Sequence, residues 1–220
     1  PGNGKALSLD GEWEFYWERL LTKDTLSAND PDAVVPVPSA WNEYVINGEK
    51  LSGEGFATYR LHIKTAAPEG TMLAFRMYTC SSAYRLYVDD RLIASNGTVS
   101  ETKERETGEY RPLAASFAAP GEDFDIILQV SNHQYARGGI WYRIYFGGEE
   151  AIGELHDKIM GKEYFILGTL IITALFYFSL FILQRELRHY LWFSLLCLFM
   201  GVCLDMVGQF VIPRWLPGLT

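Results

Sequence analysis

Residues Tyr164–Leu183 read YFILGTLIITALFYFSLFIL, a stretch of twenty residues without a charged side chain. An α-helix of that length rises about 30 Å, which matches the hydrocarbon thickness of a bilayer. A second apolar segment, 190–212, follows the short polar loop 184–189. The sequence therefore predicts two transmembrane helices, 164–183 and 190–212, and divides the chain into a water-soluble part and a membrane part.

The part before the apolar stretch is acidic. Residues 1–163 hold 16 Lys and Arg against 25 Asp and Glu, a net charge of −9. This balance argues against nucleic acid or anionic lipid as the partner of the soluble part. Cys80 is the only cysteine there, so cysteine usage does not identify the compartment. Both ends of the chain read as cut, and we interpret it as a piece of a longer protein.

The soluble part is dominated by short segments in which apolar and polar residues alternate. A period of two is typical of antiparallel strands with one buried face. Turns are expected at Asp10-Gly11 and Asp89-Asp90, with Arg91–Ala94 returning after the second. The alternating segments are Leu7–Trp17, Thr58–Thr65, Met72–Tyr78, Tyr84–Val88, Phe124–Val130 and Ile140–Phe146.

Two other segments do not alternate. Val34–Trp41 contains Pro36 and Pro38, which cannot donate to a sheet ladder, so we expect an edge or extended connection. Glu18–Pro31 is polar and predicts a loop or short helix. Many short strands with Gly, Asn and Asp turns indicate an all-β sandwich or jelly roll over residues 1–148.

Residues 149–163 predict a juxtamembrane linker helix, because Ile152, Leu155 and Ile159 have helical spacing and no proline intervenes before the apolar stretch. Arg185 and Arg188 place loop 184–189 in the cytoplasm by the positive-inside rule. The β-domain is then extracytoplasmic, and residues 213–220 begin an outer loop. Aromatic residues at the expected interfaces are Tyr190, Trp192 and Trp215.

Candidate ligand contacts lie between the last two predicted strands, since sandwich loops gather at its ends. Asn132, His133, Tyr135 and Arg137 precede Gly138-Gly139 and offer donors, acceptors and an aromatic face. Two interpretations stay open: ligand recognition, or bracing of the loop through backbone hydrogen bonds. Three further residues are expected at this end, namely Trp141, Tyr110 and Arg111.

No catalytic, metal or cofactor site is predicted. Glycoside hydrolysis needs two facing carboxylates, and the acidic run Glu101–Glu109 reads as a solvated loop. The four histidines are scattered, without Cys or His at ligand spacing. Asp205 lies within the second apolar segment, where a carboxylate is costly and commonly functional. A protonated Asp205 near the outer interface is the alternative.

Four motifs resemble the sugar-binding domain of glycoside hydrolase family 2 enzymes. Leu9–Phe15 (LDGEWEF) is similar to its opening strand, and Val35–Asn42 (VPVPSAWN) to its VPxSW segment. Gly55–Arg60 (GFATYR) resembles its GxxWYRR strand, and Ala83–Asn96 resembles its hairpin, with Asp89-Asp90 where Asn-Gly is usual. The resemblance implies a galactose-binding-like jelly roll. The barrel that carries catalysis in those enzymes is absent from this sequence.

The membrane part resembles the bacterial seven-transmembrane receptors with diverse intracellular signalling modules (7TM-DISM). FYFSLFILQRELRHYLWFSLL is similar to their first two helices, and Val130–Asn132 with Gly138–Trp141 to the end of their outer jelly roll. Phe178 departs from an Asn common on the first helix. The resemblance implies the bacterial inner membrane, several spans, and a kinase, cyclase or phosphodiesterase output joined in cis beyond this chain.

We therefore expect the input portion of a receptor, not itself an enzyme, whose outer jelly roll binds a small molecule or carbohydrate. Its other partners are the lipid bilayer and the cytoplasmic output domain, a homodimer is left open, and nucleic acid is not expected. Two alternatives remain: an accessory carbohydrate-binding domain of a membrane-anchored glycoside hydrolase, and an envelope protein-assembly module.

Overall fold

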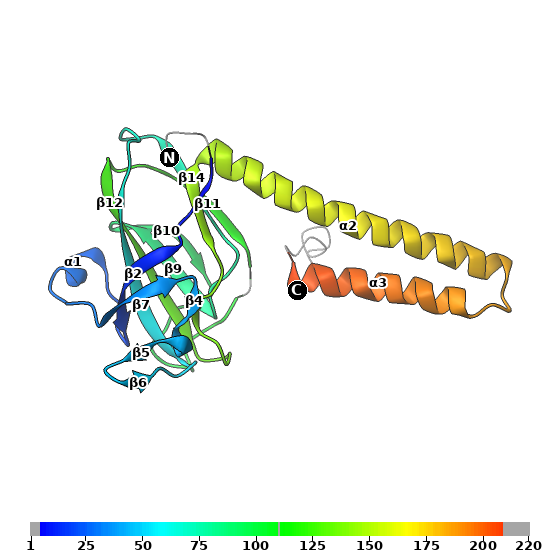
Figure 1. Ribbon diagram of the computed structural model, residues 1–220, viewed down its shortest axis with the longest axis horizontal. Helices are drawn as coiled ribbons and strands as arrows, with labels where there is room; N and C mark the ends of the chain where they lie inside the picture. The colour runs from blue at the N-terminus through cyan, green and yellow to red at the C-terminus, as the bar shows by residue number, and fades with distance from the viewer. Residues whose placement is uncertain (1–4, 110, 209–220) are drawn as a thin grey trace. The chain divides into compact units, whose positions relative to one another are not determined.

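The computed structural model describes residues 5–109 and 111–208, and the chain divides into two compact units, Pro1–Glu154 and Leu155–Thr220. The first unit is a β-sandwich and the second contains a helical hairpin (Figure 1). The division falls after Glu154 rather than at residue 148. The first residues of helix α2 therefore belong with the sandwich.

The larger sheet has six antiparallel strands in the order β10-β9-β12-β7-β2-β3. Strand β3 is at its edge, as Pro36 and Pro38 predict, because an edge strand can lack ladder donors on one side. The longest pairing joins β12 to β7 over ten residue pairs, from Asp123↔Lys64 to Asn132↔Gly55. The bounds are β2 Gly11–Trp17, β3 Ala33–Val37, β7 Gly55–Lys64, β9 Ala83–Val88, β10 Arg91–Asn96 and β12 Asp123–Asn132.

The smaller sheet has four antiparallel strands in the order β1-β14-β8-β11. The chain passes between the sheets repeatedly. Strand β8 follows β7, β11 follows β10, and β14 comes after β12 and the short strand β13. This crossing connectivity is that of a jelly roll. The bounds are β1 Leu7–Ser8, β8 Met72–Met77, β11 Leu113–Ala118 and β14 Ile144–Gly148; two short pairs join β4 Ser39–Ala40 to β13 Gly139–Ile140 and β5 Val45–Ile46 to β6 Glu49–Lys50, while Trp41–Glu43 form a 3-10 turn.

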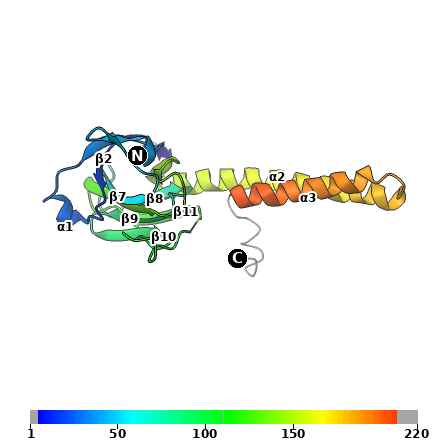
Figure 2. The same ribbon diagram turned by 90° about the horizontal axis from the view of Figure 1, so that it is seen from below.

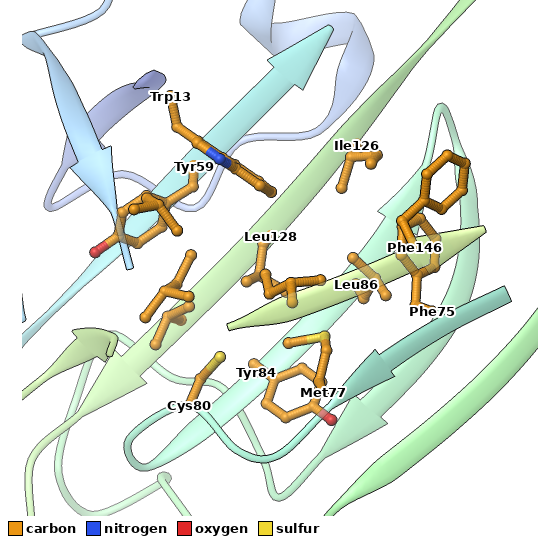
Figure 3. Close-up of a cluster of buried hydrophobic side chains, with 14 of the residues drawn as sticks. Trp13, Tyr59, Phe75, Met77, Cys80, Tyr84, Leu86, Ile126, Leu128 and Phe146 are labelled. Carbon is orange, nitrogen blue, oxygen red and sulfur yellow. The ribbon is translucent and has the colours of Figure 1, made fainter. Parts of the chain in front are cut away.

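The core lies between the two sheets, where side chains from both interdigitate (Figure 3). The predicted alternation is confirmed on β8, whose Leu73, Phe75 and Met77 are all buried. Phe75 stacks on Phe117 of β11 with ring centroids 5.1 Å apart. The other core residues labelled in Figure 3 are Trp13, Tyr59, Cys80, Tyr84, Leu86, Ile126, Leu128 and Phe146.

The outer face of the six-stranded sheet is also covered, which alternation alone does not predict. Residues 18–31, with helix α1 at Lys23–Leu26, pack Leu21 and Leu26 against Tyr16 and Ile127. Gln129 Nε2 donates to the Leu21 carbonyl at 3.0 Å, which fixes this cover to β12. The central strand β12 is therefore buried on both faces.

Two expectations for the sandwich are wrong, and one strand was not predicted. Ile140–Phe146 is not one strand, because Gly139–Ile140 pairs with β4 while Ile144–Gly148 pairs with β8 and β1. Leu113–Ala118 is a strand although its small residues give little pattern. Glu101–Glu109 is not wholly solvated, since the Glu106 side chain is fully buried. Its Oε1 accepts hydrogen bonds from Ser82 Oγ at 2.5 Å and from the His133 backbone N–H at 3.0 Å.

Helix α2 spans Glu149–Leu183 without a break, and α3 spans His189–Val207. Within the second unit α3 runs back along α2 (Figures 1 and 2), and Ser194 Oγ donates to the Ala174 carbonyl at 2.8 Å. Only α2 among the described helices is long and apolar enough to cross a membrane by length and composition; α3 holds a shorter apolar segment, His189–Asp205. The remainder of predicted helix 190–212, and Trp215, lie outside the described residues.

Candidate functional site

The loop between β12 and β13 is held in place by Asn132 at the end of β12. The Asn132 side chain is fully buried. Its Nδ2 donates to the carbonyls of Gly53 and Tyr135, each at 2.7 Å, and its Oδ1 accepts from the Tyr135 N–H at 3.1 Å. All three bonds are to backbone, so in this structure Asn132 braces the loop.

Two glycines let the same loop approach Trp41. A Cβ at Gly138 would lie 2.3 Å from the Trp41 ring, and one at Gly53 would lie 2.2 Å from the Ala136 carbonyl oxygen. Trp41 Nε1 donates to Gly53 O at 3.0 Å. The loop thus rests on a rigid floor whose close contacts only glycine permits.

The same loop borders a hollow of about 320 Å³, lined by Ser81, Tyr135, Ala136, Arg137 and Trp141. It gathers residues from two chain regions, because Ser81 precedes β9 and forms a β-bridge with Gly139. The volume is at the lower end of the range for small-molecule sites, which is about 300–1,000 Å³.

Two polar atoms of this lining are buried without a hydrogen-bond partner among the described residues. They are Ser81 Oγ, on a residue only 1% exposed, and Trp141 Nε1. More than about 90% of buried polar groups in folded proteins are satisfied. Two residues that line this hollow, Ser81 and Trp141, therefore carry hydrogen-bonding capacity that no described residue uses.

Arg137 stands at the rim of the hollow with its side chain 54% exposed. Its Nη2 donates to Glu43 Oε1 at 3.2 Å, and its guanidinium lies 5.3 Å from the centroid of the Trp141 ring. Trp141 also packs beside Tyr142, with ring centroids 5.0 Å apart. The Tyr142 ring in turn packs on Tyr78, with ring centroids 4.7 Å apart. The aromatic cluster therefore continues beyond the residues that line the hollow.

The structure brings together three of the predicted site residues, Tyr135, Arg137 and Trp141. His133 lies elsewhere: its Nε2 is 3.2 Å from the Ser100 carbonyl, which can only accept, so this nitrogen carries hydrogen. Arg111 is exposed and its carbonyl accepts from Asn96 Nδ2 at 3.1 Å. Tyr110 lies outside the described residues.

Sequence reasoning missed Ser81. Serine is common in loops, and no pattern marks one whose hydroxyl is buried and unpaired. A signal was nevertheless available in Thr79–Ser82, where four small or polar residues follow a fully apolar strand face.

Asp205 is buried on α3 within the helical unit. It lines a small hollow of about 90 Å³ together with Glu163, Ile166, Leu167 and Leu204. The hollow is mostly apolar and far smaller than a ligand-sized site. Asp205 and Glu163 of α2 therefore border the same hollow, a neighbour that the sequence did not indicate.

A third hollow, of about 430 Å³ and with a more polar lining, lies on the outer face of the large sheet beside α1. Three of its charged residues form ion pairs: Arg60 with Asp125 at 2.9 Å and with Glu14 at 3.0 Å, and Lys23 with Asp89 at 2.9 Å. Burial alone would raise the pKa of Asp125, but hydrogen bonds from Arg60 and His62 outweigh it and lower the pKa below its usual value. We interpret these ion pairs as structural contacts that stabilise this face of the sheet.

No protein-family model and no curated protein matches the chain. Solved structures similar to it include a GH2 β-galacturonidase from Eisenbergiella tayi (16% identity, TM-score 0.46) and a β-glucuronidase from Ruminococcus gnavus (14%, 0.47). A putative β-galactosidase from Bacteroides fragilis is similar at 17% identity and a TM-score of 0.46. Each match covers 64% of this chain but only 24%, 28% and 23% of those chains, respectively.

Proposed function

We propose that this chain is the input portion of a bacterial transmembrane receptor whose outer sandwich binds a small polar ligand, in particular a carbohydrate, in the hollow of Ser81 and Trp141. The observation that carries the binding proposal is that two residues lining one hollow, Ser81 and Trp141, each hold a buried polar atom without a hydrogen-bond partner among the described residues. A sugar presents many hydroxyls that accept and donate hydrogen bonds, and apolar C–H faces that pack on aromatic rings. The lining offers both kinds of contact, with the exposed ring of Tyr135 as the apolar face.

The membrane proposal rests on the surface of the helices. Apolar side chains on α2 and α3 are exposed, among them Phe165 at 75% and Leu183 at 78%. Such a surface is unfavourable in water and suits lipid. With Arg185 and Arg188 in the connecting loop on the cytoplasmic side, the sandwich lies outside the inner membrane.

Coupling is proposed to pass along α2, which runs unbroken from Glu149 to Leu183. A ligand can shift a two-state equilibrium only by binding one state better than the other. The sandwich would therefore need to hold the residues around Glu149–Glu163 differently with and without ligand. In the full-length receptor, a flexible Gly-Ser insertion after Gly148 is expected to abolish ligand-dependent output.

The binding proposal is tested by calorimetric titration of the chain in nanodiscs with a panel of monosaccharides. Ser81→Ala and Trp141→Phe each remove one donor and are expected to weaken binding about 3- to 10-fold. Ser116→Ala, at an exposed position of β11, is the matched control and should bind as the unmodified chain does. Binding that neither hollow variant affects would contradict the proposal.

Orientation is tested with an impermeant maleimide on intact cells. Glu104→Cys lies in an exposed loop of the sandwich and should be labelled from outside, whereas Glu186→Cys should be labelled only after lysis. The unmodified chain controls for native thiols; Cys80 should not react, because burial raises the pKa of its thiol. Labelling of Glu186→Cys on intact cells would refute the orientation.

An accessory carbohydrate-binding domain of a membrane-anchored glycoside hydrolase is the second candidate. The same hollow would serve it, because both candidates need sugar recognition by the sandwich. The sequence after Thr220 distinguishes them: further apolar helices favour the receptor, and a catalytic barrel favours the hydrolase. An assembly module is distinguished by the titration, since it predicts no sugar binding.

A further inference from the structure

The surface of the Ser81–Trp141 hollow is mostly apolar, and the polar groups on its lining residues are chiefly hydrogen-bond donors. The indole Nε1–H of Trp141 can only donate, and so can the guanidinium of Arg137, whereas the Ser81 hydroxyl can do either. Glu43, the carboxylate that accepts a hydrogen bond from Arg137, does not line the hollow. Its two oxygens already accept from Arg137 and from Ser39 Oγ. A complementary ligand is therefore one that presents acceptors.

Arg137 retains most of its binding capacity. Among the described residues its guanidinium makes one hydrogen bond, to Glu43, out of five N–H donors. The ion pair is solvent-exposed on both sides, with side chains 54% and 57% exposed, so it contributes little and can be exchanged. A carboxylate in the hollow could replace or share it through a charge-assisted, bidentate contact.

Trp141 is not an open platform for a neutral sugar. Arg137 lies over its ring and Tyr142 packs beside it. A neutral sugar that stacks on this ring displaces the guanidinium, whereas an anionic ligand engages it. General attraction of anions cannot explain such binding, because the chain carries a net charge of −8.

We infer that the hollow selects a carboxylate-bearing sugar, an acidic monosaccharide or the acidic end of an oligosaccharide. The carboxylate is bound by the Arg137 guanidinium and Trp141 Nε1–H, and a ring hydroxyl by Ser81 Oγ. This inference rests on the proposed function, since it names the ligand class for the same hollow.

The test is calorimetric titration of the full chain in nanodiscs with D-glucuronate, its uncharged methyl ester and D-glucose. Glucuronate is expected to bind about 10-fold more tightly than either neutral probe, as charge-assisted bonds are roughly twice as strong as neutral ones. Arg137→Gln should reduce that preference to within about twofold. Glu43→Gln, the matched control, frees Arg137 and should preserve or increase the preference.

The outcomes separate this inference from the proposed function. If glucose and the ester bind as tightly as glucuronate, and Ser81→Ala still weakens them, the acidic-ligand inference is overturned and the proposed sugar site stands. If no probe binds at all, both are overturned. Because the Arg137 side chain is exposed, Arg137→Gln should unfold at the temperature of the unmodified chain, so a lost preference reports on binding.

Discussion

Asn132 is the side chain on which the position of the candidate binding loop depends most. Replacing it with alanine removes both hydrogen bonds to Tyr135 and one to Gly53. Gly53 O keeps the bond from Trp41 Nε1, so the main loss is at the Tyr135 N–H and C=O. A buried group that loses its partner costs about 1–3 kcal/mol. Water reaches part of this exposed loop, and we expect a total of about 2–3 kcal/mol.

The assay is thermal unfolding of the chain in detergent micelles, followed by tryptophan fluorescence. For a chain of this size each kcal/mol shifts Tm by roughly 2–4 °C, so Asn132→Ala should lower Tm by roughly 4–12 °C. Asn132→Asp should lower it further at neutral pH, because carboxylate oxygens would face the carbonyls of Gly53 and Tyr135.

Gln134→Ala is the matched control, an exposed amide in the same loop. Its effect should stay within about 0.5 kcal/mol, as is usual for surface positions. If Asn132→Ala shifted Tm no more than Gln134→Ala, the argument that buried side chain–backbone bonds hold this loop would be refuted.

Three further predictions address the floor, the outer face and the helices. Gly138→Ala places a Cβ 2.3 Å from the Trp41 ring and should destabilise the sandwich by at least about 2 kcal/mol, measured as a lowered Tm, while Gly148→Ala, with open space around it, should not. Asp125→Asn should lower the free energy of unfolding at pH 7 and make it decline less steeply in acid. The Asp125 carboxyl has a lowered pKa in the folded state, so it stabilises the fold at pH values above its unfolded pKa of about 3.9. That stabilisation is lost as the pH falls through the folded pKa. Acid titration of stability checks this against Asp90→Asn, and equal curves would contradict it. Ser194→Ala should weaken the hairpin by about 0.6 kcal/mol in SDS unfolding, whereas Ser179→Ala, which loses only a bond to Leu175 of its own helix, should change it less.

Strand alternation and proline placement made much of the sandwich predictable. They identify β7, β8, β9 and β12, and Pro36 and Pro38 identify the edge strand. Strand β11, Leu113–Ala118, could not be predicted because Ala and Ser have no strong preference for either face of a sheet. The break at Trp141–Arg143 could not be predicted either. The segment before it pairs with β4 and the segment after it with β8, and local sequence alternation does not indicate such long-range pairing.

The candidate site was predictable in its location but not in its roles. Gly138-Gly139 and the polar residues before them marked the loop, because loops at sandwich ends carry ligands. Which side chains face the hollow depends on backbone geometry: Asn132 and His133 turn toward backbone partners, while Tyr135, Arg137 and Trp141 line the hollow. Ser81 joins them from a distant part of the sequence, through its bridge to Gly139.

The central claim is that the unpaired groups of this hollow bind a ligand, and the indole N–H of Trp141 reports on it directly. In a ¹⁵N-tryptophan-labelled chain the six indole signals can be followed by NMR while D-glucuronate is added, with Trp141→Phe assigning the signal. The account predicts a saturable shift of the Trp141 signal and little change at Trp41, whose Nε1 is bonded to Gly53 O. A Trp141 signal that does not move while glucuronate or another sugar binds elsewhere would contradict the account.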